Sequence, residues 1–359
     1  MKHQTTVALT LAVLVMPWLA SASTWHVEKD GAGDFTVIQE AVDAASDGDT
    51  IKIGPGRFED FFEQQSFDVW NIALIEGKSL TFLGAGVENT ILGPEEIGII
   101  DSHFVNCIRT FGDGIVVRVS DIRFENVQAD GIRMSEPGRI EVDDCEFENC
   151  GGGLWGSFRD GGWIRNCAFY DIDQELGDRC IELYAPTVGV VVEDCLFRDS
   201  GTGVSSDWAG THDNVIRRCD FEGGQNGVRV IAGASVTVEN SSFSGQSRRS
   251  ILGDDPGTVI IEGNHIDTTG SGGWCLLTFN GSGEYIIRDN TMSSDGIIIG
   301  MYTSRMEIEC HGNHFIRTGA DAWYIHPGGA GPEHHPGDLR ILDFTDNHWG
   351  TNDPDEVAA

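Results

Sequence analysis

The stretch VRVSDIRFENVQADGIRMSEPGRIEVDDCEF at residues 117–147 contains one short pattern twice. A few alternating apolar residues are followed by a small or polar residue, one further position and a large apolar residue, which is Phe124 in the first copy and Phe147 in the second. Between them lies a second alternating run, GIRMSE at 131–136. Alternation with period two in short runs, separated by Gly, Asn and Asp, predicts β-strands rather than helices.

The same pattern recurs to the end of the chain. Its large apolar anchor positions are Phe124, Phe147, Phe169, Phe197, Phe221, Phe243, Ile266, Met292, Phe315 and Trp349. A repeat this short cannot bury its apolar face alone, whereas parallel stacking of equivalent strands about 4.8 Å apart buries it in one core. The sequence therefore predicts an all-β, single-domain right-handed parallel β-helix over residues 23–359, with regular repeats at 117–349.

A second column of equivalent residues lies two positions before the anchors. It comprises Ile122, Cys145, Cys167, Cys195, Cys219, Ser241, Asn264, Asn290, Asn313 and Asn347. Asn tolerates the left-handed bend of a turn, and its amide can bond to the next rung. We expect the four cysteines to be buried free thiols, because parallel Cβ atoms about 4.8 Å apart exceed the usual disulfide separation of about 3.8 Å.

The N-terminal residues are typical of a secretory signal peptide. A short positive start precedes the apolar run from Val7 to Ala20, and Ala20-Ser21-Ala22 offers a cleavage site after residue 22. The sequence thus predicts a secreted or cell-surface protein with a signal peptide at 1–22.

An uncovered end of a solenoid exposes the core and the edge of each sheet to solvent. Residues 35–46 place apolar side chains at helical spacing after Asp34, a candidate N-cap, and predict a helix that covers the N-terminal opening. No similar segment follows Trp349, so we expect the natural chain to extend beyond residue 359.

The charge balance narrows the possible partners. The chain has 57 acidic and 23 Lys or Arg residues, a formal net charge of −34. Such a field repels nucleic acid and anionic membranes, and it repels polyuronates unless a divalent cation bridges the two. We therefore expect no nucleic-acid or membrane partner, no required cofactor (with Ca²⁺ as the one candidate), and a monomer that meets an extracellular polysaccharide or surface glycan.

Two N-terminal segments resemble the opening of pectin methylesterases. They are VEKDGAGDFTVIQEAVDAASDGDTIKIGPGRFED (27–60) and LTFLGAGVENTIL (80–92), and VSDIRFENVQADGIRM follows the same rhythm. The resemblance covers about the first quarter of the mature chain and implies the same β-helix fold. In that family two Asp and an Arg remove the ester, but here Gly151 to Leu154 replace the Gln-Asp-Thr-Leu motif and the Leu-Gly-Arg-Pro-Trp motif is absent. The catalytic set therefore does not carry over.

The second half resembles the broad class of bacterial right-handed β-helix repeat proteins, including a closing Asn-x-Trp-Gly…Asp-Pro signature that begins at Asn347. That class is defined by its fold and has no single activity.

Candidate functional residues lie on the strands that begin near Gly131, Gly153, Cys180, Gly203 and Gly227. Alternation predicts outward columns that contain Arg133, Trp155, Glu182, Ser205 and Arg229, with Tyr184 and Asp207 alongside. Glu182 and Asp207 would then have Cβ atoms about 7–8 Å apart, within the range for an inverting glycosidase pair.

We assign Glu182, Asp207 and Arg229 as candidate catalytic residues, and Trp155, Tyr184 and Arg133 as candidate sugar-binding residues. The alternative is that these are ordinary surface residues, since a chain with 57 carboxylates readily produces a suitably spaced pair by chance.

Two functions fit this surface. One is an enzyme, a hydrolase or lyase, that acts on an extracellular polysaccharide along one outer sheet face. The other is a non-catalytic cell-surface or adhesion module, and pectin methylesterase activity is disfavoured by the missing motifs.

Overall fold

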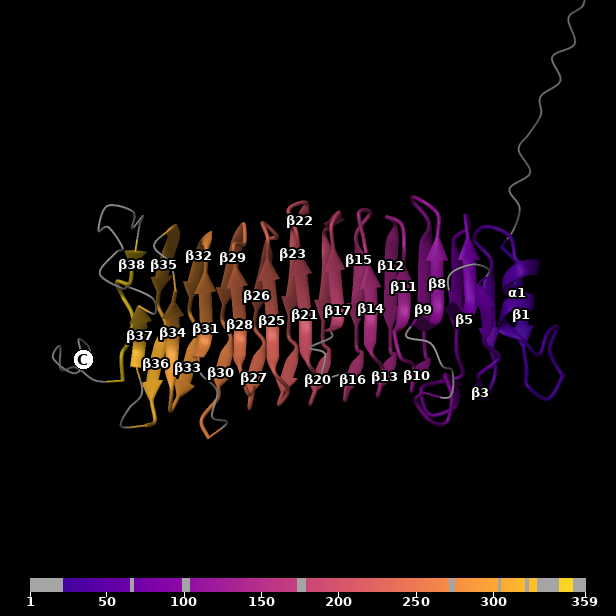
Figure 1. Ribbon diagram of the computed structural model, residues 1–359, viewed down its shortest axis with the longest axis horizontal. Coiled ribbons are helices and arrows are strands. Elements are labelled where there is room, and N and C mark those ends of the chain that lie inside the picture. The colour runs from indigo at the N-terminus through magenta and orange to yellow at the C-terminus, as the bar shows by residue number, and fades with distance from the viewer. Residues whose placement is uncertain are drawn as a thin grey trace, which may run out of the picture.

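The computed structural model describes residues 22–64, 68–98, 104–172, 179–270, 275–302, 305–319, 323–327 and 342–350. In these ranges the chain coils into one right-handed parallel β-helix (Figure 1). Each complete turn contributes one strand to each of three long sheets, here named A, B and C. The predicted fold is confirmed, while the predicted signal peptide lies outside the described residues.

Sheet A has 13 parallel strands in order along the solenoid. They are β1 (Thr24–Val27), β2 (Thr50–Ile53), β6 (Leu80–Leu83), β9 (Val116–Ser120), β12 (Arg139–Asp143), β15 (Gly162–Arg165), β19 (Val190–Glu193), β23 (Asn214–Arg217), β26 (Val236–Glu239), β29 (Thr258–Glu262), β32 (Ser282–Arg288), β35 (Arg305–His311) and β38 (Leu342–Asp343).

Sheet B has 11 parallel strands and follows sheet A within each turn. They are β3 (Gly56–Phe58), β7 (Thr90–Leu92), β10 (Arg123–Glu125), β13 (Glu146–Glu148), β16 (Ala168–Tyr170), β20 (Leu196–Arg198), β24 (Asp220–Glu222), β27 (Ser242–Ser244), β30 (His265–Asp267), β33 (Thr291–Ser294) and β36 (His314–Arg317).

Sheet C has 12 strands, of which all but the first pair run parallel. They are β4 (Phe62–Gln64), β5 (Val69–Glu76), β8 (Phe104–Phe111), β11 (Asp130–Met134), β14 (Gly152–Gly156), β17 (Arg179–Tyr184), β21 (Thr202–Asp207), β25 (Asn226–Ile231), β28 (Arg249–Asp254), β31 (Cys275–Asn280), β34 (Ile297–Met301) and β37 (Trp323–Pro327). A short parallel pair, β18 (Thr187–Val188) and β22 (Thr211–His212), lies beside the main sheets.

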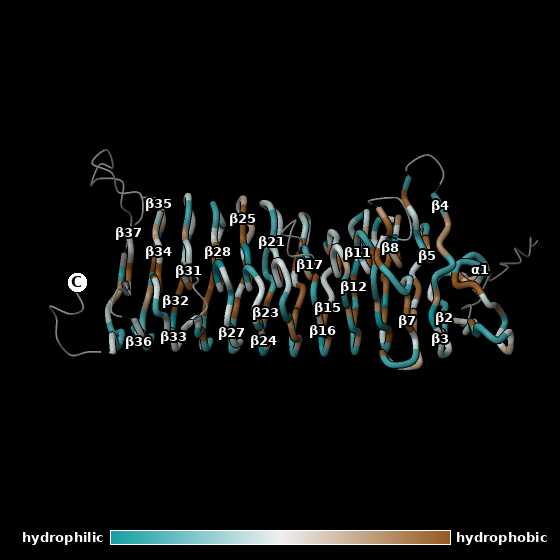
Figure 2. Tube along the Cα trace, turned by 60° about the horizontal axis from the view of Figure 1, so that its bottom comes forward, coloured by the Kyte–Doolittle hydropathy of each residue, from teal (hydrophilic) through white to brown (hydrophobic). Residues whose placement is uncertain are grey.

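The anchors form one buried column on the inner face of sheet B. Phe rings stack from Phe124 to Phe243 with centroids 4.5–5.0 Å apart, and the column continues through Ile266, Met292 and Phe315. The last anchor, Trp349, is half-buried and stacks 4.6 Å from Phe315. Figure 2 shows hydrophobic and hydrophilic residues alternating in every turn. Parallel pairing starts earlier than predicted, at β1.

The column two residues before the anchors occupies the corner between sheets A and B. The left-handed backbone conformation belongs to the residue before it, as at Asp289 (φ 58°), so the predicted left-handed bend at Asn was wrong, whereas the predicted amide bond to the next rung is present. The amide of Asn290 donates to Asn313 Oδ1 at 2.9 Å and accepts from Asn264 Nδ2 at 3.0 Å, which joins successive rungs. In earlier rungs Cys Sγ donates to the carbonyl two residues before it, as Cys195 does to Glu193 O at 3.3 Å.

The N-terminal helix is shorter than predicted. α1 spans Ile38–Ala44 and buries Ile38, Ala41 and Val42 at the end of the solenoid, beside β1 and β5. Asp34 does not cap it, because Asp34 Oδ2 accepts from the His26 backbone N–H at 2.9 Å and Val37 holds the extended N-cap position. Within the described ranges, no helix is long and apolar enough to cross a bilayer.

The ladder thiols give a direct test of the parallel stack. All eight cysteines with described side chains are free and buried, and burial raises the pKa of thiols such as Cys167 and Cys195. We expect alkylation to label these thiols in unfolded, unreduced protein and to spare them in the folded protein, as read by mass spectrometry. Disulfides among Cys145, Cys167, Cys195 and Cys219 would contradict the stacking geometry.

Asn290 tests the corner ladder. Replacing it with Ala leaves the buried backbone N–H of Asn264 without its partner and removes one hydrogen bond to the Ile261 carbonyl, so the free energy of unfolding should fall by about 2–3 kcal/mol. Asn290→Ser should lose less, because Ser241 accepts from Cys219 N and donates to Glu239 O in the equivalent position. Urea unfolding measures both changes. Equal stability of wild type and the Ala variant would show that the ladder adds nothing.

Candidate functional site

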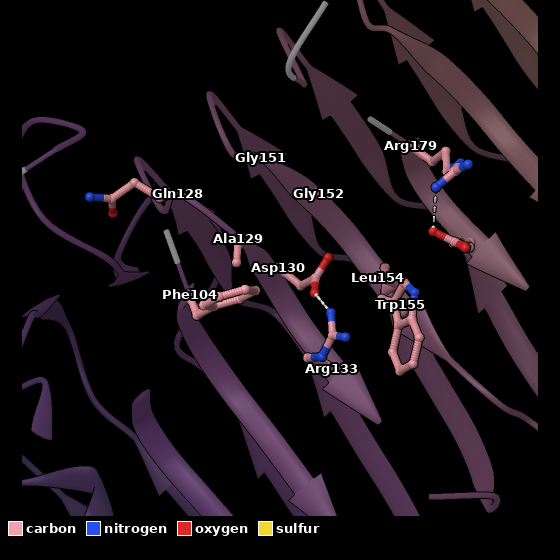
Figure 3. Close-up of a pocket in the computed structure, with 11 residues that line it drawn as sticks. Phe104, Gln128, Ala129, Asp130, Arg133, Gly151, Gly152, Leu154, Trp155 and Arg179 are labelled. Atoms are coloured by element: carbon pink, nitrogen blue, oxygen red, sulfur yellow. Dashed lines mark hydrogen bonds and ion pairs between the residues drawn. The ribbon is translucent and has the colours of Figure 1, made fainter. Parts of the chain in front are cut away.

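A pocket of about 310 Å³ opens on the outer face of sheet C, across β11, β14 and β17. Figure 3 shows its lining side chains. They are Phe104, Gln128, Ala129, Asp130, Arg133, Gly151, Gly152, Leu154, Trp155, Arg179 and Glu182.

The parallel register builds one wall of the pocket. Arg133 pairs with Trp155, and Trp155 pairs with Glu182, so these three outer side chains follow each other along the solenoid. On the same strands, Ile132 and Ile181, each directly before a residue of this column, are buried in the core. Arg133, Trp155 and Glu182 thus form part of the column that we predicted, whereas Ser205, the next residue in register, is fully buried.

A second outer column, which strict alternation does not predict, faces the first. Positions 131 and 132 both face the core, because a Cβ at Gly131 would lie 2.8 Å from the Phe147 ring and Ile132 is buried. The same holds two strands later, on β17, at Cys180 and Ile181, which are fully buried. Two consecutive inward residues bring Asp130 and Arg179, three residues before the first column, to the outer face.

Two ion pairs flank the pocket, and the acid comes first in the sequence in one pair and the arginine first in the other. In the sequence Asp130-Gly-Ile-Arg133, Arg133 Nη1 donates to Asp130 Oδ2 at 2.6 Å. In Arg179-Cys-Ile-Glu182, Arg179 Nη1 donates to Glu182 Oε2 at 2.8 Å. The pocket therefore presents an acid and a cation on each side (Figure 3).

Glycines on the strand between these pairs leave the space open. A Cβ at Gly152 would lie 2.4 Å from Asp130 Oδ1, and one at Gly151 would lie 2.1 Å from Gln128 O. Any side chain at either position would fill the pocket or displace its neighbours.

Aromatic rings continue the first wall. The Arg133 guanidinium carbon lies 3.9 Å from the centre of the Trp155 ring, and Trp155 stacks on Tyr184 with centroids 5.4 Å apart at 30°. Trp155 and Tyr184 are both half-buried. Such rings offer apolar faces to a ligand while the cation fixes the Trp155 ring.

Glu182 has an unusual electrostatic environment. It is 9% exposed, and burial raises its pKa to about 6, with Arg179 opposing the rise and the Asp207 and Asp130 charges adding to it. A carboxyl group with a pKa near neutral can exist in both protonation states under ordinary conditions, which proton transfer requires.

Asp207 differs from our expectation of a solvent-facing partner. It lies diagonal to Glu182, whose register partner is Ser205, but it is 2% exposed and is not among the residues that line the pocket. Ser205 Oγ donates to its Oδ1 at 2.5 Å, and Arg179 Nη2 lies 3.7 Å from its Oδ2. Flanking side chains therefore satisfy this carboxylate, and Asp207 positions Arg179 rather than facing a ligand.

Arg229 is also placed differently from its predicted role. It pairs in register with Ser205, two strands from Glu182, and is half-buried. Among the described residues it has neither an ion pair nor a hydrogen-bond partner, so Arg179 is the cation that contacts both carboxylates. The repeated i, i+3 spacing of opposite charges at 130–133 and 179–182 is the sequence signal that would have indicated Arg179 and Asp130.

Metal ligation has no support in the described part of the chain, where no three His, Cys, Asp or Glu side chains group as a metal site would need. The described side chains that line the pocket supply carboxyl groups, guanidinium groups and aromatic rings.

Comparison with solved structures places the chain among proteins of the same fold. A mannuronic-acid-specific polysaccharide family 6 lyase from human gut microbiota has 11% identity and a TM-score of 0.62, over 94% of this chain and 84% of that one. A tailspike protein mutant of E. coli bacteriophage HK620, in complex with a pentasaccharide, has 14% identity and a TM-score of 0.63, over 81% of this chain and 59% of that one.

An alginate lyase from Paenibacillus sp. str. FPU-7 has 15% identity and a TM-score of 0.51, over 85% of this chain and 99% of that one. Pectin methylesterase from carrot reaches a TM-score of only 0.34, so that resemblance rests on the sequence. None of the curated proteins matches the sequence.

The family model for the right-handed β-helix region matches residues 89–210 and 180–333, which together span more than half of the chain. The chain therefore belongs to the right-handed β-helix family.

Proposed function

We propose that this chain is a secreted protein that binds an extracellular polysaccharide across the outer face of sheet C and cleaves it with Glu182 as the proton-transferring group. The observation that carries the proposal is the buried Glu182 carboxyl, whose pKa is raised to about 6, on the wall of an open pocket. Hydrolysis and elimination of a glycosidic bond both use a side chain that transfers a proton, and a carboxyl group with a pKa near 6 can serve as that side chain.

The other pocket side chains suit a sugar ligand. Trp155 and Tyr184 offer ring faces, and Asp130 and Arg133 offer acceptors and donors for hydroxyl groups. Arg179 holds Glu182 in place and also faces Asp207, so we assign Arg179 and Asp207 as positioning residues. The ion pair with Arg179 keeps the Glu182 carboxyl at the pocket wall.

The structural neighbours support a glycan ligand because of what those proteins themselves act on or bind. Two are named as lyases that act on mannuronic acid polysaccharide or alginate, and one was solved with a pentasaccharide. At 11–15% identity these likenesses show the fold, so the pocket and its residues carry the proposal.

The test combines a polysaccharide panel with two variants. Glu182→Gln should lower turnover at least about a hundredfold, because general acid–base catalysis typically contributes 10²–10⁴-fold. Trp155→Ala should instead weaken binding, by about 1–3 kcal/mol if stacking resembles that of other planar rings. Product analysis separates the reactions, since elimination leaves a carbon–carbon double bond and hydrolysis does not.

Matched controls lie on the other two sheets. Glu222→Gln removes a carboxylate that pairs with Arg198 at 2.7 Å, and Trp163→Ala removes a ring that lies 5.2 Å from both Arg139 and Arg165. Neither should change binding or turnover. Binding that depends on Trp155 without turnover would favour the non-catalytic adhesion module, and no binding to any glycan would overturn the proposal.

A further inference from the structure

Few large apolar side chains of the described residues are strongly exposed, and two of them are aromatic, one at the pocket and one directly after a sheet C strand. Phe104 is 56% exposed and lines the pocket, while Trp208 is 50% exposed and directly follows Asp207. The third, Ile97, is 47% exposed and is not among the pocket-lining residues. Exposed aromatic rings beside a binding pocket are candidates for ligand contact.

The register of sheet C places four aromatic residues on one diagonal. Phe104 begins β8 five residues before Arg109, and Arg109 belongs to the column of Arg133 and Trp155. Beyond Trp155 the order continues through Tyr184, whose register partner is Asp207, to Trp208. From β8 to β21 this row crosses four strand intervals, about 19 Å along the solenoid. It begins at the N-terminal end of β8 and ends just after the C-terminal end of β21.

The backbone at Trp208 sets this residue apart. Its φ is 76°, in the left-handed region, where nearly all other such non-glycine residues of the described chain are Asp or Asn. The following rungs hold Ala232, Asp255 and Gly281 in the same conformation after their sheet C strands. A large ring in this conformation costs conformational energy, and an exposed ring recovers little of it through packing.

We propose that the polysaccharide crosses sheet C along this diagonal, and that Phe104 and Trp208 are outer stacking subsites on either side of the pocket. The inference rests on the proposed function, because it assumes that the pocket binds a glycan. Phe104 would contact the sugar that enters the pocket edge, and Trp208 would contact a sugar beyond Tyr184 and Asp207. The ligand class is then an oligosaccharide long enough to span several rungs, rather than a single sugar.

The experiment measures affinity against chain length. The probes are mannuronic acid oligomers and neutral cello-oligosaccharides, each from disaccharide to octasaccharide, and titration calorimetry gives the dissociation constants. In wild type, affinity should rise with length until the row is filled. Trp208→Ala should weaken binding of the longest oligomers about tenfold and leave that of the shortest bound oligomer unchanged. Phe104→Ala should weaken binding of short and long oligomers alike, because Phe104 lines the pocket itself.

Two controls accompany this experiment. Ala232 already occupies the left-handed position one rung later, so Ala at position 208 fits the backbone, and equal urea midpoints would verify folding. Ile97→Ala removes a similarly exposed apolar side chain that does not line the pocket and should change nothing.

The two proposals fail differently. Oligomer binding that depends on Trp155 but not on Trp208 or Phe104 would overturn the diagonal path and leave the proposed function standing. Equal loss for short and long oligomers in Trp208→Ala would also overturn it, because a distant subsite affects only long ligands. Failure of wild type to bind any probe would overturn both.

Discussion

The fixed spacing between equivalent residues of successive turns is the constraint on which the structure depends. Because parallel strands lie about 4.8 Å apart, any side chain in one turn meets its counterpart in the next at contact distance. Phenylalanine rings 4.5–5.0 Å apart satisfy this spacing inside sheet B, and Asn amides satisfy it at the corner through bonds such as Asn290 to Asn313. A single residue type repeated at one position thereby becomes a column, and stability is shared between neighbouring turns.

The same constraint builds the pocket where the repeat is broken. Between Asp130 with Arg133 and Arg179 with Glu182, the intervening strand supplies Gly151 and Gly152, so the outer surface loses two side chains there. The two ion pairs therefore border an open space. Burial in this setting, with Asp207 and Asp130 nearby, gives Glu182 a raised pKa that Arg179 only partly offsets.

The fold could be read from the sequence because the anchors repeat, and a repeat of this kind permits few structures. The outer column of Arg133, Trp155 and Glu182 followed from alternation and is present. Asp130 and Arg179 escaped prediction because two successive residues face the core within β11 and within β17, and alternation alone cannot show such a shift. The burial of Asp207 also escaped prediction, since it depends on Ser205 and on an arginine from the neighbouring strand.

The central claim is that the pocket holds a carboxyl group prepared for proton transfer, and the protonation of Glu182 tests it most directly. An NMR titration of the side-chain carboxyl carbon should give a pKa of about 6 in the wild type, against an ordinary value of 4.5. Asp207→Asn should lower that pKa, because the Asp207 charge raises it. A Glu182 pKa at the ordinary value, unchanged by Asp207→Asn, would contradict the account.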